Sequence, residues 1–501
     1  MERAVRQDMY EPTLKEVKKM VGTVNRVAIW REIEAELETP VSAYLKVARP
    51  PYSFLLESVE GEERIARYSF IGTEPYGVIK TGPGQKDGAV DPLGLIEKAL
   101  EPLILGEVSE GERFNGGAVG YLSYETSKYF EKLPSPKRDP LNLPESVFML
   151  VSTFLAFDHV RRKIRVVSHV NLDGDVRQGY TDAVGRIDQL IDRLNAPIPT
   201  RANKPVYENL SKETKSNMTK ASYDRKIEKI INYIHAGDCI QVVFSQRFSR
   251  STSAEPLEIY RALRGINPSP YMFFLNMDDF QMVGASPEML VRCVGGHLEY
   301  HPIAGTRPRG TTPEEDAGLE EEMCNSEKEI AEHVMLVDLG RNDVGRVSKK
   351  GTVDVAQFMD VERYSHVMHL VSHITGELKD DLTSYDALRS CFPAGTLSGA
   401  PKIRAMEIIA ELEPVKRGPY AGAVGYIDLK GNMDTAIALR TMIVKDEVAY
   451  VQAGGGIVAD SMADEEYMET VHKSSALFRA IDEAESVVSE PSEGEDLDPK
   501  G

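Results

Sequence analysis

The stretch SEKEIAEHVMLVDLGR, residues 326–341, predicts a helix with a well-defined start. Ser326 and Glu329 have the spacing of a capping box, in which the serine oxygen and the glutamate carboxylate each satisfy a free backbone N–H. The helix is therefore expected to begin at Ser326 and to run through Arg341. Glu329 and Glu332 are three residues apart, so they share one face of this helix.

A second helix with the same acidic spacing is predicted from near Ser461 through DEEYMETVHKSSALFRAID. Glu466 and Glu469 share one face, and Lys473 follows Glu469 by four residues. Carboxylates on two facing helices can hold Mg²⁺, which accepts one carboxylate from each helix and keeps several waters. Each pair also has a simpler explanation, because Glu329 would cap its helix and Glu469 with Lys473 could be a surface ion pair.

The segments around these two helices alternate between helix and strand patterns. YDRKIEKIINYIHAG (223–237) repeats apolar residues at helical spacing and stops at Gly237, and CIQVVFSQRF (239–248) alternates like a strand. Further strands are predicted at AGAVGYIDL (421–429), AIALRTMIV (436–444) and AYVQAGGGIV (449–458). Because strands and helices cluster without strict β-α-β alternation, the predicted fold class is α+β.

A chain of 501 residues is too long for one ordinary core and favours two domains. The polar, proline-containing stretch 196–222 is typical of a linker. We therefore expect an N-terminal domain over residues 1–215 and a catalytic domain over residues 216–485. The Ser-, Glu- and Asp-rich end, residues 486–501, is predicted to be a disordered acidic tail.

The net charge of −20 argues against nucleic acid and anionic membranes as partners, although a local pocket can still be basic. No apolar run approaches the roughly 20 residues of a membrane span, and the N-terminus lacks an apolar signal core. These features predict a cytoplasmic protein. The four cysteines are far apart in the sequence and form no CxxC pair, so we expect reduced thiols rather than a zinc site or disulfides.

Three glycine-rich stretches could bring backbone N–H groups close to an anionic ligand: HPIAGTRPRG (301–310), FPAGTLSGAPK (392–402) and VQAGGGIVADS (451–461). None matches a P-loop or a dinucleotide-binding fingerprint. Arg440, inside the strand-like AIALRTMIV, either pairs with an internal carboxylate or binds a ligand carboxylate in bidentate fashion. His369 has apolar neighbours and is either an ordinary buried histidine or a proton donor.

Six strings in order together resemble the chorismate-utilising enzymes, and among them the anthranilate synthase component I family. They are PIAGTRPRG, SEKEIAEHVMLVDLGRND, FPAGTLSGAPK, GAVGY, QAGGGIVADS and EEYMETVHK, within a similarity that covers roughly residues 40–482. The resemblance implies antiparallel sheets packed with helices. It also implies a Mg²⁺-dependent carbon–oxygen lyase of tryptophan biosynthesis, which converts chorismate and ammonia to anthranilate and pyruvate.

The resemblance also implies roles for individual residues. Mg²⁺ would bind the ring carboxylate of chorismate, with Glu332 and Glu469 as direct ligands and Glu329 and Glu466 in support. His369 would help the ring hydroxyl to leave, and Glu288 is a second acid–base candidate. The groups implied to bind the substrate are Arg440 and Tyr420 with the backbone near Gly454 and Gly456 at the enolpyruvyl carboxylate, Gly305, Thr306 and the catalytic candidate Thr396 around the ring, and Lys473.

Two positions distinguish members of this family. Aminodeoxychorismate synthases commonly carry a lysine at the position of Ala304, where it can attack the ring covalently. Isochorismate and salicylate synthases carry a lysine at the position of Gln241, where it activates water. Alanine and glutamine can do neither, so both positions favour ammonia as the nucleophile.

The N-terminal half resembles the tryptophan feedback site of the same family. Glu57 and Ser58 would bind the amino group of tryptophan, and Arg67 the carboxylate. Pro270, Tyr271 and Met272 would form an apolar wall for the indole. The alternative is that SFLLES (53–58) is a plain strand and NPSPYM (267–272) a plain turn.

The chain contains no cysteine in an amidotransferase-like elbow, so the ammonia is expected from a separate glutamine amidotransferase subunit, typically within a heterotetramer. Free ammonium should replace this subunit. Three alternatives stay open at this point: an aminodeoxychorismate synthase subunit, a non-catalytic tryptophan-binding regulator, and a Mg²⁺-dependent nucleotide enzyme.

Overall fold

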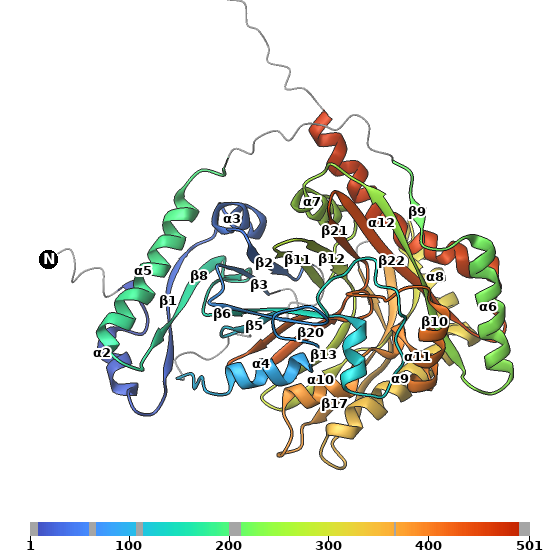
Figure 1. Cartoon of the computed structure of the whole chain (residues 1–501), viewed down its shortest axis with the longest axis horizontal. Coiled ribbons are helices and arrows are strands. Elements are labelled where there is room, and N and C mark those ends of the chain that lie inside the picture. The colour runs from blue at the N-terminus through green and yellow to red at the C-terminus, as the bar shows by residue number, and fades with distance from the viewer. Residues whose placement is uncertain (1–8, 60–66, 107–113, 200–211, 365–366, 490–501) are drawn as a thin grey trace, which may run out of the picture.

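The computed structural model describes residues 9–59, 67–106, 114–199, 212–364 and 367–489. Two large antiparallel sheets form the centre of the molecule, and helices cover them (Figure 1). The α+β fold class, with antiparallel sheets packed against helices, is thereby confirmed. No helix in the described ranges is both long enough and apolar enough to cross a membrane. All four cysteines carry free thiols.

The first sheet has 12 strands. In spatial order these are β1 (Arg26–Glu34), β8 (Lys163–Asn171), β7 (Thr153–Asp158), β3 (Tyr68–Thr73), β2 (Tyr52–Glu57), β11 (Tyr271–Met277), β12 (Gln281–Ser286), β21 (Thr441–Lys445), β22 (Val448–Ile457), β10 (Gln241–Ser251) and β18 (Gly399–Ala400), with β9 (Lys215–Ser216) paired to β10.

The second sheet has 10 strands. Its order is β15 (Ile303–Pro308), β17 (Val367–Glu377), β14 (His297–Tyr300), β13 (Met289–Val294), β20 (Met433–Ile437), β19 (Ala423–Asp428), β5 (Gly117–Leu122), β6 (Ser146–Val151) and β4 (Gly77–Thr81), with β16 (Asp354–Arg363) paired to β17.

The α-helices are α2 (Leu14–Val17), α3 (Pro40–Val47), α4 (Pro92–Leu100), α5 (Val176–Asn195), α6 (Lys220–His235), α7 (Pro256–Ile266), α8 (Pro313–Asn325), α9 (Glu327–Val347), α10 (Ser384–Cys391), α11 (Lys402–Leu412) and α12 (Ala463–Ser489). Short 3₁₀ turns occur at η2 (Lys18–Met20), η3 (Tyr124–Tyr129) and η4 (Gly395–Leu397). In Figure 1, α3 and α7 lie on the upper side of the sheets, whereas α4, α9 and α10 lie below them.

Three apolar layers hold these elements together. Aromatic side chains from both sheets, among them Phe54, Phe154 and Tyr426, pack between the sheets. A second cluster lies between the first sheet and helices α3, α5, α7 and α12. A third cluster joins strands of both sheets to helices α4, α6, α9, α10 and α11. Each sheet therefore buries both faces, which explains why several strands are apolar without alternation.

Both sheets take strands from either side of residue 215, the boundary expected from the sequence. In the first sheet β2 pairs with β11, and in the second β5 pairs with β19. The linker prediction falls partly on residues 200–211, which lie outside the described residues. Helix α12 continues to Ser489, past the predicted start of the acidic tail at residue 486, and residues 490–501 are outside the described part.

Arg440 was placed inside a strand by the sequence pattern, and this prediction is wrong. β20 ends at Ile437 and β21 begins at Thr441, with Arg440 at the break between them. Its backbone has a φ of 46°. This left-handed conformation interrupts the strand ladder and is uncommon for a residue with a side chain.

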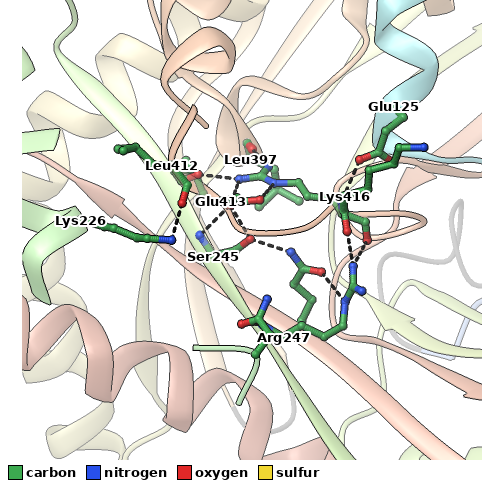
Figure 2. Close-up of polar contacts among 12 residues, drawn as sticks. Glu125, Lys226, Ser245, Arg247, Leu397, Leu412, Glu413 and Lys416 are labelled. Carbon is green, nitrogen blue, oxygen red and sulfur yellow. Dashed lines mark hydrogen bonds and ion pairs between the residues drawn. The ribbon is translucent and has the colours of Figure 1, made fainter. Parts of the chain in front are cut away.

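A buried ion pair connects several of these segments. Glu413 follows α11, and its carboxylate accepts hydrogen bonds from the backbone N–H and the hydroxyl of Ser245 on β10, at 2.9 and 2.7 Å (Figure 2). Arg417 donates to the same carboxylate at 2.9 and 2.7 Å. Both side chains are almost fully buried, with exposed fractions of 1% and 2%.

Because Glu413 and Arg417 compensate each other's charge in the interior, loss of either charge should be costly. We expect Glu413→Gln to lower the free energy of unfolding by about 3–5 kcal/mol, since the guanidinium would stay buried without its counter-charge. Urea unfolding followed by circular dichroism measures the difference. Asp380→Asn, which removes an exposed partner of Lys349, is the control and should leave stability unchanged. Equal midpoints for both variants would contradict the prediction.

Candidate active site

The four predicted metal-ligating glutamates converge from helices α9 and α12. Burial raises the pKa of the Glu332 carboxyl, and the nearby Glu329 and Glu469 raise it further. The side-chain amide of Gln241, on β10, donates to Glu332 Oε1 at 3.0 Å and opposes this rise. Carboxylates of the two helices therefore lie close enough to raise one another's pKa, which indicates a local excess of negative charge.

On helix α12, the pKa of the Glu466 carboxyl is subject to the same opposing effects. Burial raises its pKa, and Glu469 adds to the rise, while the Ser461 hydroxyl donates to Glu466 Oε1 at 2.6 Å and lowers it. The second oxygen, Oε2, is buried without a hydrogen-bond partner among the described residues. A Cβ at Gly455 would lie 2.6 Å from this oxygen, so only glycine leaves the space around it free.

These features fit a hard divalent cation that is held from two sides. Mg²⁺ prefers carboxylate oxygens, keeps several waters and needs only one or two protein carboxylates. Within the described part of the chain, no three His, Cys, Asp or Glu side chains are close enough to form a complete protein cage. A cation bound here would therefore need waters and a bound anion as further ligands.

Glu329 does not complete the predicted capping box. Ser326 caps α9 by accepting from the Glu329 backbone N–H at 3.4 Å, as predicted. The Glu329 carboxylate, however, accepts from Arg307 of β15 at 3.1 Å and does not return to the Ser326 backbone. Because its cationic partner Arg307 lies on β15, the Glu329 carboxylate points toward the glycine-rich stretch 301–310.

That stretch positions His369. Gly305 has a φ of 62° and sits at a register shift between β15 and β17, where Thr306 pairs with His369. His369 Nδ1 lies 3.2 Å from the Gly305 carbonyl oxygen and 3.0 Å from the Thr306 hydroxyl. Because a carbonyl oxygen can only accept, Nδ1 carries the proton in this arrangement. Burial lowers the His369 pKa to about 4, with a further contribution from Arg440, so the ring is neutral near pH 7.

Gly305 also connects this histidine to the acidic helices. A Cβ at Gly305 would lie 3.2 Å from Glu329 Oε2. The backbone of the glycine-rich stretch thus lies between the carboxylates of α9 and the His369 ring. One continuous site contains both groups.

Glu288, Thr396 and Arg440 form the inner wall. Burial raises the pKa of the Glu288 carboxyl to about 8, and Thr396 and Arg440 oppose the rise only in part. Glu288 is therefore mostly protonated near pH 7. The Thr396 hydroxyl is buried and has no hydrogen-bond partner of good geometry among the described residues. Arg440 makes no ion pair within 4.0 Å in the described ranges, so its guanidinium is available to an anionic ligand.

Tyr420, Gly454 and Lys473 lie together on another side of the site. Tyr420 is buried, and its hydroxyl lies 3.1 Å from the position of a Cβ at Gly454. Lys473 pairs with Glu469 at 2.5 Å and donates to the Gly454 carbonyl oxygen at 3.1 Å. Gly456 has a steric role, because a Cβ there would lie 2.4 Å from the Gln241 amide that binds Glu332.

A separate cavity of about 70 Å³ contains five of the six residues predicted for tryptophan. Glu57, Ser58, Pro270, Tyr271 and Met272 all line it, because β2 pairs with β11 and places Glu57 opposite Met272. The Ser58 hydroxyl is buried without a partner among the described residues. Burial raises the pKa of Glu57, which Arg264 and the Tyr260 hydroxyl oppose.

Arg67 does not belong to this cavity. Its guanidinium pairs with Asp158 across β3 and β7 at 2.7 Å. The strand pairing satisfies the arginine locally, and the sequence contains no sign of this cross-strand partner. Arg292 and Asp434 line the cavity in its place.

Sequence reasoning missed several groups that shape the site. Gly455 was not separated from its two neighbours, and Gln241 was considered only as a choice of nucleophile. Gln241 contacts Glu332 across 91 residues of sequence, and Arg307 contacts Glu329 across 22. The buried Arg417 pairs with Glu413, only 4 residues away. Only the last has a local signal, the i, i+4 spacing of Glu413 and Arg417.

Comparison with known proteins finds similarity to one enzyme family over most of the chain. The chorismate binding enzyme family matches residues 51–479. The anthranilate synthase component 1 of Acetivibrio thermocellus is 47% identical, covering 95% of this chain and 99% of the relative. That of Pseudomonas aeruginosa is also 47% identical, covering 93% and 97%.

Two solved structures have folds similar to that of this chain. Anthranilate synthase component I from Streptococcus pneumoniae superposes with a TM-score of 0.73 at 37% identity, covering 89% of this chain and 99% of that one. A menaquinone-specific isochorismate synthase from Escherichia coli has a TM-score of 0.71 at 18% identity, covering 93% and 98%, and shares the fold. With its acidic helices, its glycine-rich stretches and this match over most of its length, the chain belongs to the chorismate binding enzyme family.

Proposed function

We propose that this chain is the large subunit of an anthranilate synthase, which converts chorismate and ammonia to anthranilate, pyruvate and water in tryptophan biosynthesis. The observation that carries the proposal is a site that brings together the carboxylates of two helices, a buried acid, and an arginine that makes no ion pair among the described residues. Relatives that bear the name anthranilate synthase component 1 support the choice of reaction.

Chorismate has two carboxylates, and the site offers two places for them. Glu332 and Glu469, supported by Glu329 and Glu466, would hold Mg²⁺ at the ring carboxylate. The cation, when bound, would withdraw electron density from the ring as the hydroxyl leaves. Arg440 and Tyr420 would hold the enolpyruvyl carboxylate, since the guanidinium makes no ion pair within 4.0 Å among the described residues and can bind a carboxylate in bidentate fashion.

The protonation states support Glu288 as the catalytic acid. Glu288 is protonated near neutral pH and lies beside Thr396, so it can give its proton to the departing ring hydroxyl, which leaves as water. His369 is neutral and carries its proton on Nδ1, which faces the Gly305 carbonyl. We therefore assign His369 to orienting the substrate through its other nitrogen and Glu288 to proton donation, which reverses the emphasis of the sequence prediction.

The uncharged side chains at positions 304 and 241 favour ammonia as the nucleophile. Ala304 is buried in β15 and cannot form a covalent bond to the ring. The Gln241 amide donates to Glu332, so this side chain cannot activate water as a base. Ammonia would add to the ring, the hydroxyl would leave, and elimination of pyruvate would restore aromaticity. A glutamine amidotransferase subunit would supply the ammonia, in a cytoplasmic heterotetramer.

The cavity of Glu57 and Tyr271 would be the site of feedback inhibition by tryptophan. Glu57 and the Ser58 hydroxyl can bind an ammonium group, and Met272 and Pro270 offer apolar surface to an indole ring. Arg292, which lines this cavity, would bind the carboxylate in place of Arg67.

The first test is turnover by the purified chain with chorismate, Mg²⁺ and ammonium. We expect anthranilate fluorescence that EDTA abolishes and tryptophan suppresses. Formation of aminodeoxychorismate or isochorismate would overturn the assignment of Ala304 or Gln241. Absence of chorismate consumption, with the amidotransferase partner and glutamine also added, would overturn the enzymatic function.

The metal assignment has a matched pair of variants on α12. Glu469→Gln should raise the Mg²⁺ concentration for half-maximal activity by more than about tenfold, because even outer partners of a metal ligand contribute about 10–100-fold to affinity. Glu465→Gln, on the exposed face of the same helix, should behave like the wild type. Calorimetric titration with Mg²⁺ in the presence of chorismate gives a second measure. Equal affinities for both variants would contradict the assignment.

The pKa of Glu288 predicts a basic limb in the pH profile. Its acid form dominates below about pH 8 and is lost as the pH rises through that value, so kcat/KM should fall above pH 8. Glu288→Gln should lower kcat by about 10²–10⁴-fold and remove this limb from the residual activity. A basic limb that persists unchanged in the variant would assign proton donation to another group.

A further inference from the structure

A row of polar side chains leads from the proposed tryptophan cavity across the second sheet. It begins at Arg292 of β13, which lines the cavity and is 7% exposed. Its guanidinium donates to Asp434 at 3.0 Å, to the Tyr271 hydroxyl oxygen at 3.2 Å and to Glu299 of β14 at 3.3 Å. One buried cation thus contacts both the cavity wall and a residue outside it.

The middle of the row is a pair of stacked histidines. Glu299 Oε2 lies 3.8 Å from His301 Nε2. The rings of His301 and His373 stack with centroids 3.6 Å apart and planes inclined by 17°. Pairing of β14 with β17 brings the two rings together, because Tyr300 lies opposite Ile374. Burial, with His373 and Arg292 nearby, lowers the His301 pKa to about 3, so this ring stays neutral.

The row ends beside the active-site histidine. His373 Nε2 lies 3.7 Å from Glu362 Oε1 on β16, and the Tyr364 hydroxyl donates to Glu362 Oε2 at 2.6 Å. The Tyr364 ring meets the His369 ring edge-on, with centroids 5.8 Å apart. Residues on or next to four neighbouring strands, β13, β14, β17 and β16, therefore connect the cavity wall to the His369 ring.

The cavity must change shape to accept an amino acid as large as tryptophan. Its volume is about 70 Å³, about half that of an engineered cavity of about 150 Å³ that binds benzene, and benzene is smaller than indole. Tyr271 and Arg292 form part of its wall and are joined by a hydrogen bond. Entry of an indole would therefore displace the hydroxyl or the guanidinium, and the contact of Arg292 with Glu299 would change with them.

The histidine pair is able to respond to such a change. Nε2 of His301 and Nε2 of His373 are both buried without a hydrogen-bond partner among the described residues. Each lies just beyond hydrogen-bond distance of a carboxylate, at 3.8 and 3.7 Å. A shift of less than about 1 Å would bring either pair into hydrogen-bond range, so a second arrangement of the row is close to the one observed.

We propose that the row from Arg292 to Tyr364 positions His369 and transmits occupancy of the tryptophan cavity to it. This inference rests on the proposed inhibition by tryptophan and adds its route. His301, His373 and Glu362 are positioning residues that touch no substrate. When tryptophan displaces Arg292, the row rearranges, and the His369 ring leaves the orientation that the Gly305 carbonyl and the Thr306 hydroxyl define.

The test compares His301→Gln with His297→Gln. His297 begins β14 and His301 follows its last residue, but His297 is exposed and pairs with Glu377 outside the row. The measured quantity is the ratio of chorismate KM with and without saturating tryptophan, together with kcat and the calorimetric Kd for tryptophan. In the wild type and in His297→Gln this ratio should lie in the range of about 5–150 that is typical of coupled sites.

In His301→Gln the ratio should fall toward 1, with a tryptophan Kd within about threefold of the wild type. Tyr364→Phe, which removes only a hydroxyl at the far end, should lower the ratio as well and guards against a folding defect in His301→Gln. Full coupling in both variants, with normal tryptophan binding, would overturn the transmission alone. Failure of the wild type to bind tryptophan would overturn the proposed inhibition itself and the transmission with it.

Discussion

The buried guanidinium of Arg417 joins the segments that surround the active site. Besides the Glu413 carboxylate, it donates to the carbonyl oxygens of Leu397 and Val243, both at 2.7 Å. It also lies under the rings of Tyr124 and Tyr420, 4.5 and 5.6 Å from their centroids. Arg417 thus fixes the loop that contains Thr396, strand β10 with Gln241, and Tyr420 relative to one another. Loss of any of these contacts would leave a buried charge with too few partners, which is costly.

The N-terminal half contributes to the same support. Glu125 of η3 accepts from the backbone N–H groups of Arg417 and Gly418, at 2.7 and 3.0 Å. Figure 2 shows Glu125 beside Lys416, with Arg247 on β10 and Glu413 nearby. Burial raises the Glu125 pKa to about 7, which reflects how completely this carboxylate is removed from water. The catalytic site therefore depends on residues from both halves of the chain, as the mixed sheets require.

In contrast to the buried Glu413–Arg417 ion pair, the site carboxylates of helices α9 and α12 are not neutralised by an equal number of cations among the described residues. Glu413 and Arg417 neutralise each other, whereas Glu469 raises the pKa of both Glu332 and Glu466. The Gln241 amide, the Ser461 hydroxyl and the lysines Lys328 and Lys473 lower these pKa values. A bound cation would relieve such repulsion, which is the physical reason for proposing a metal at this site. Glycines at 455 and 456 keep the surrounding space open for these carboxylates and for the Gln241 amide.

The sequence by itself determined the α+β class, the two acidic helices and the glycine-rich stretches, because these depend on local periodicity, capping and spacing. It also indicated five of the residues that line the cavity proposed to bind tryptophan, although not its arginine. Tertiary structure decided which side chains meet: Arg292 instead of Arg67 at the cavity, Arg307 on Glu329, and Arg440 in a left-handed break between strands. It also decided the protonation of Glu288 and His369, because burial sets both pKa values and depends on residues far apart in the chain.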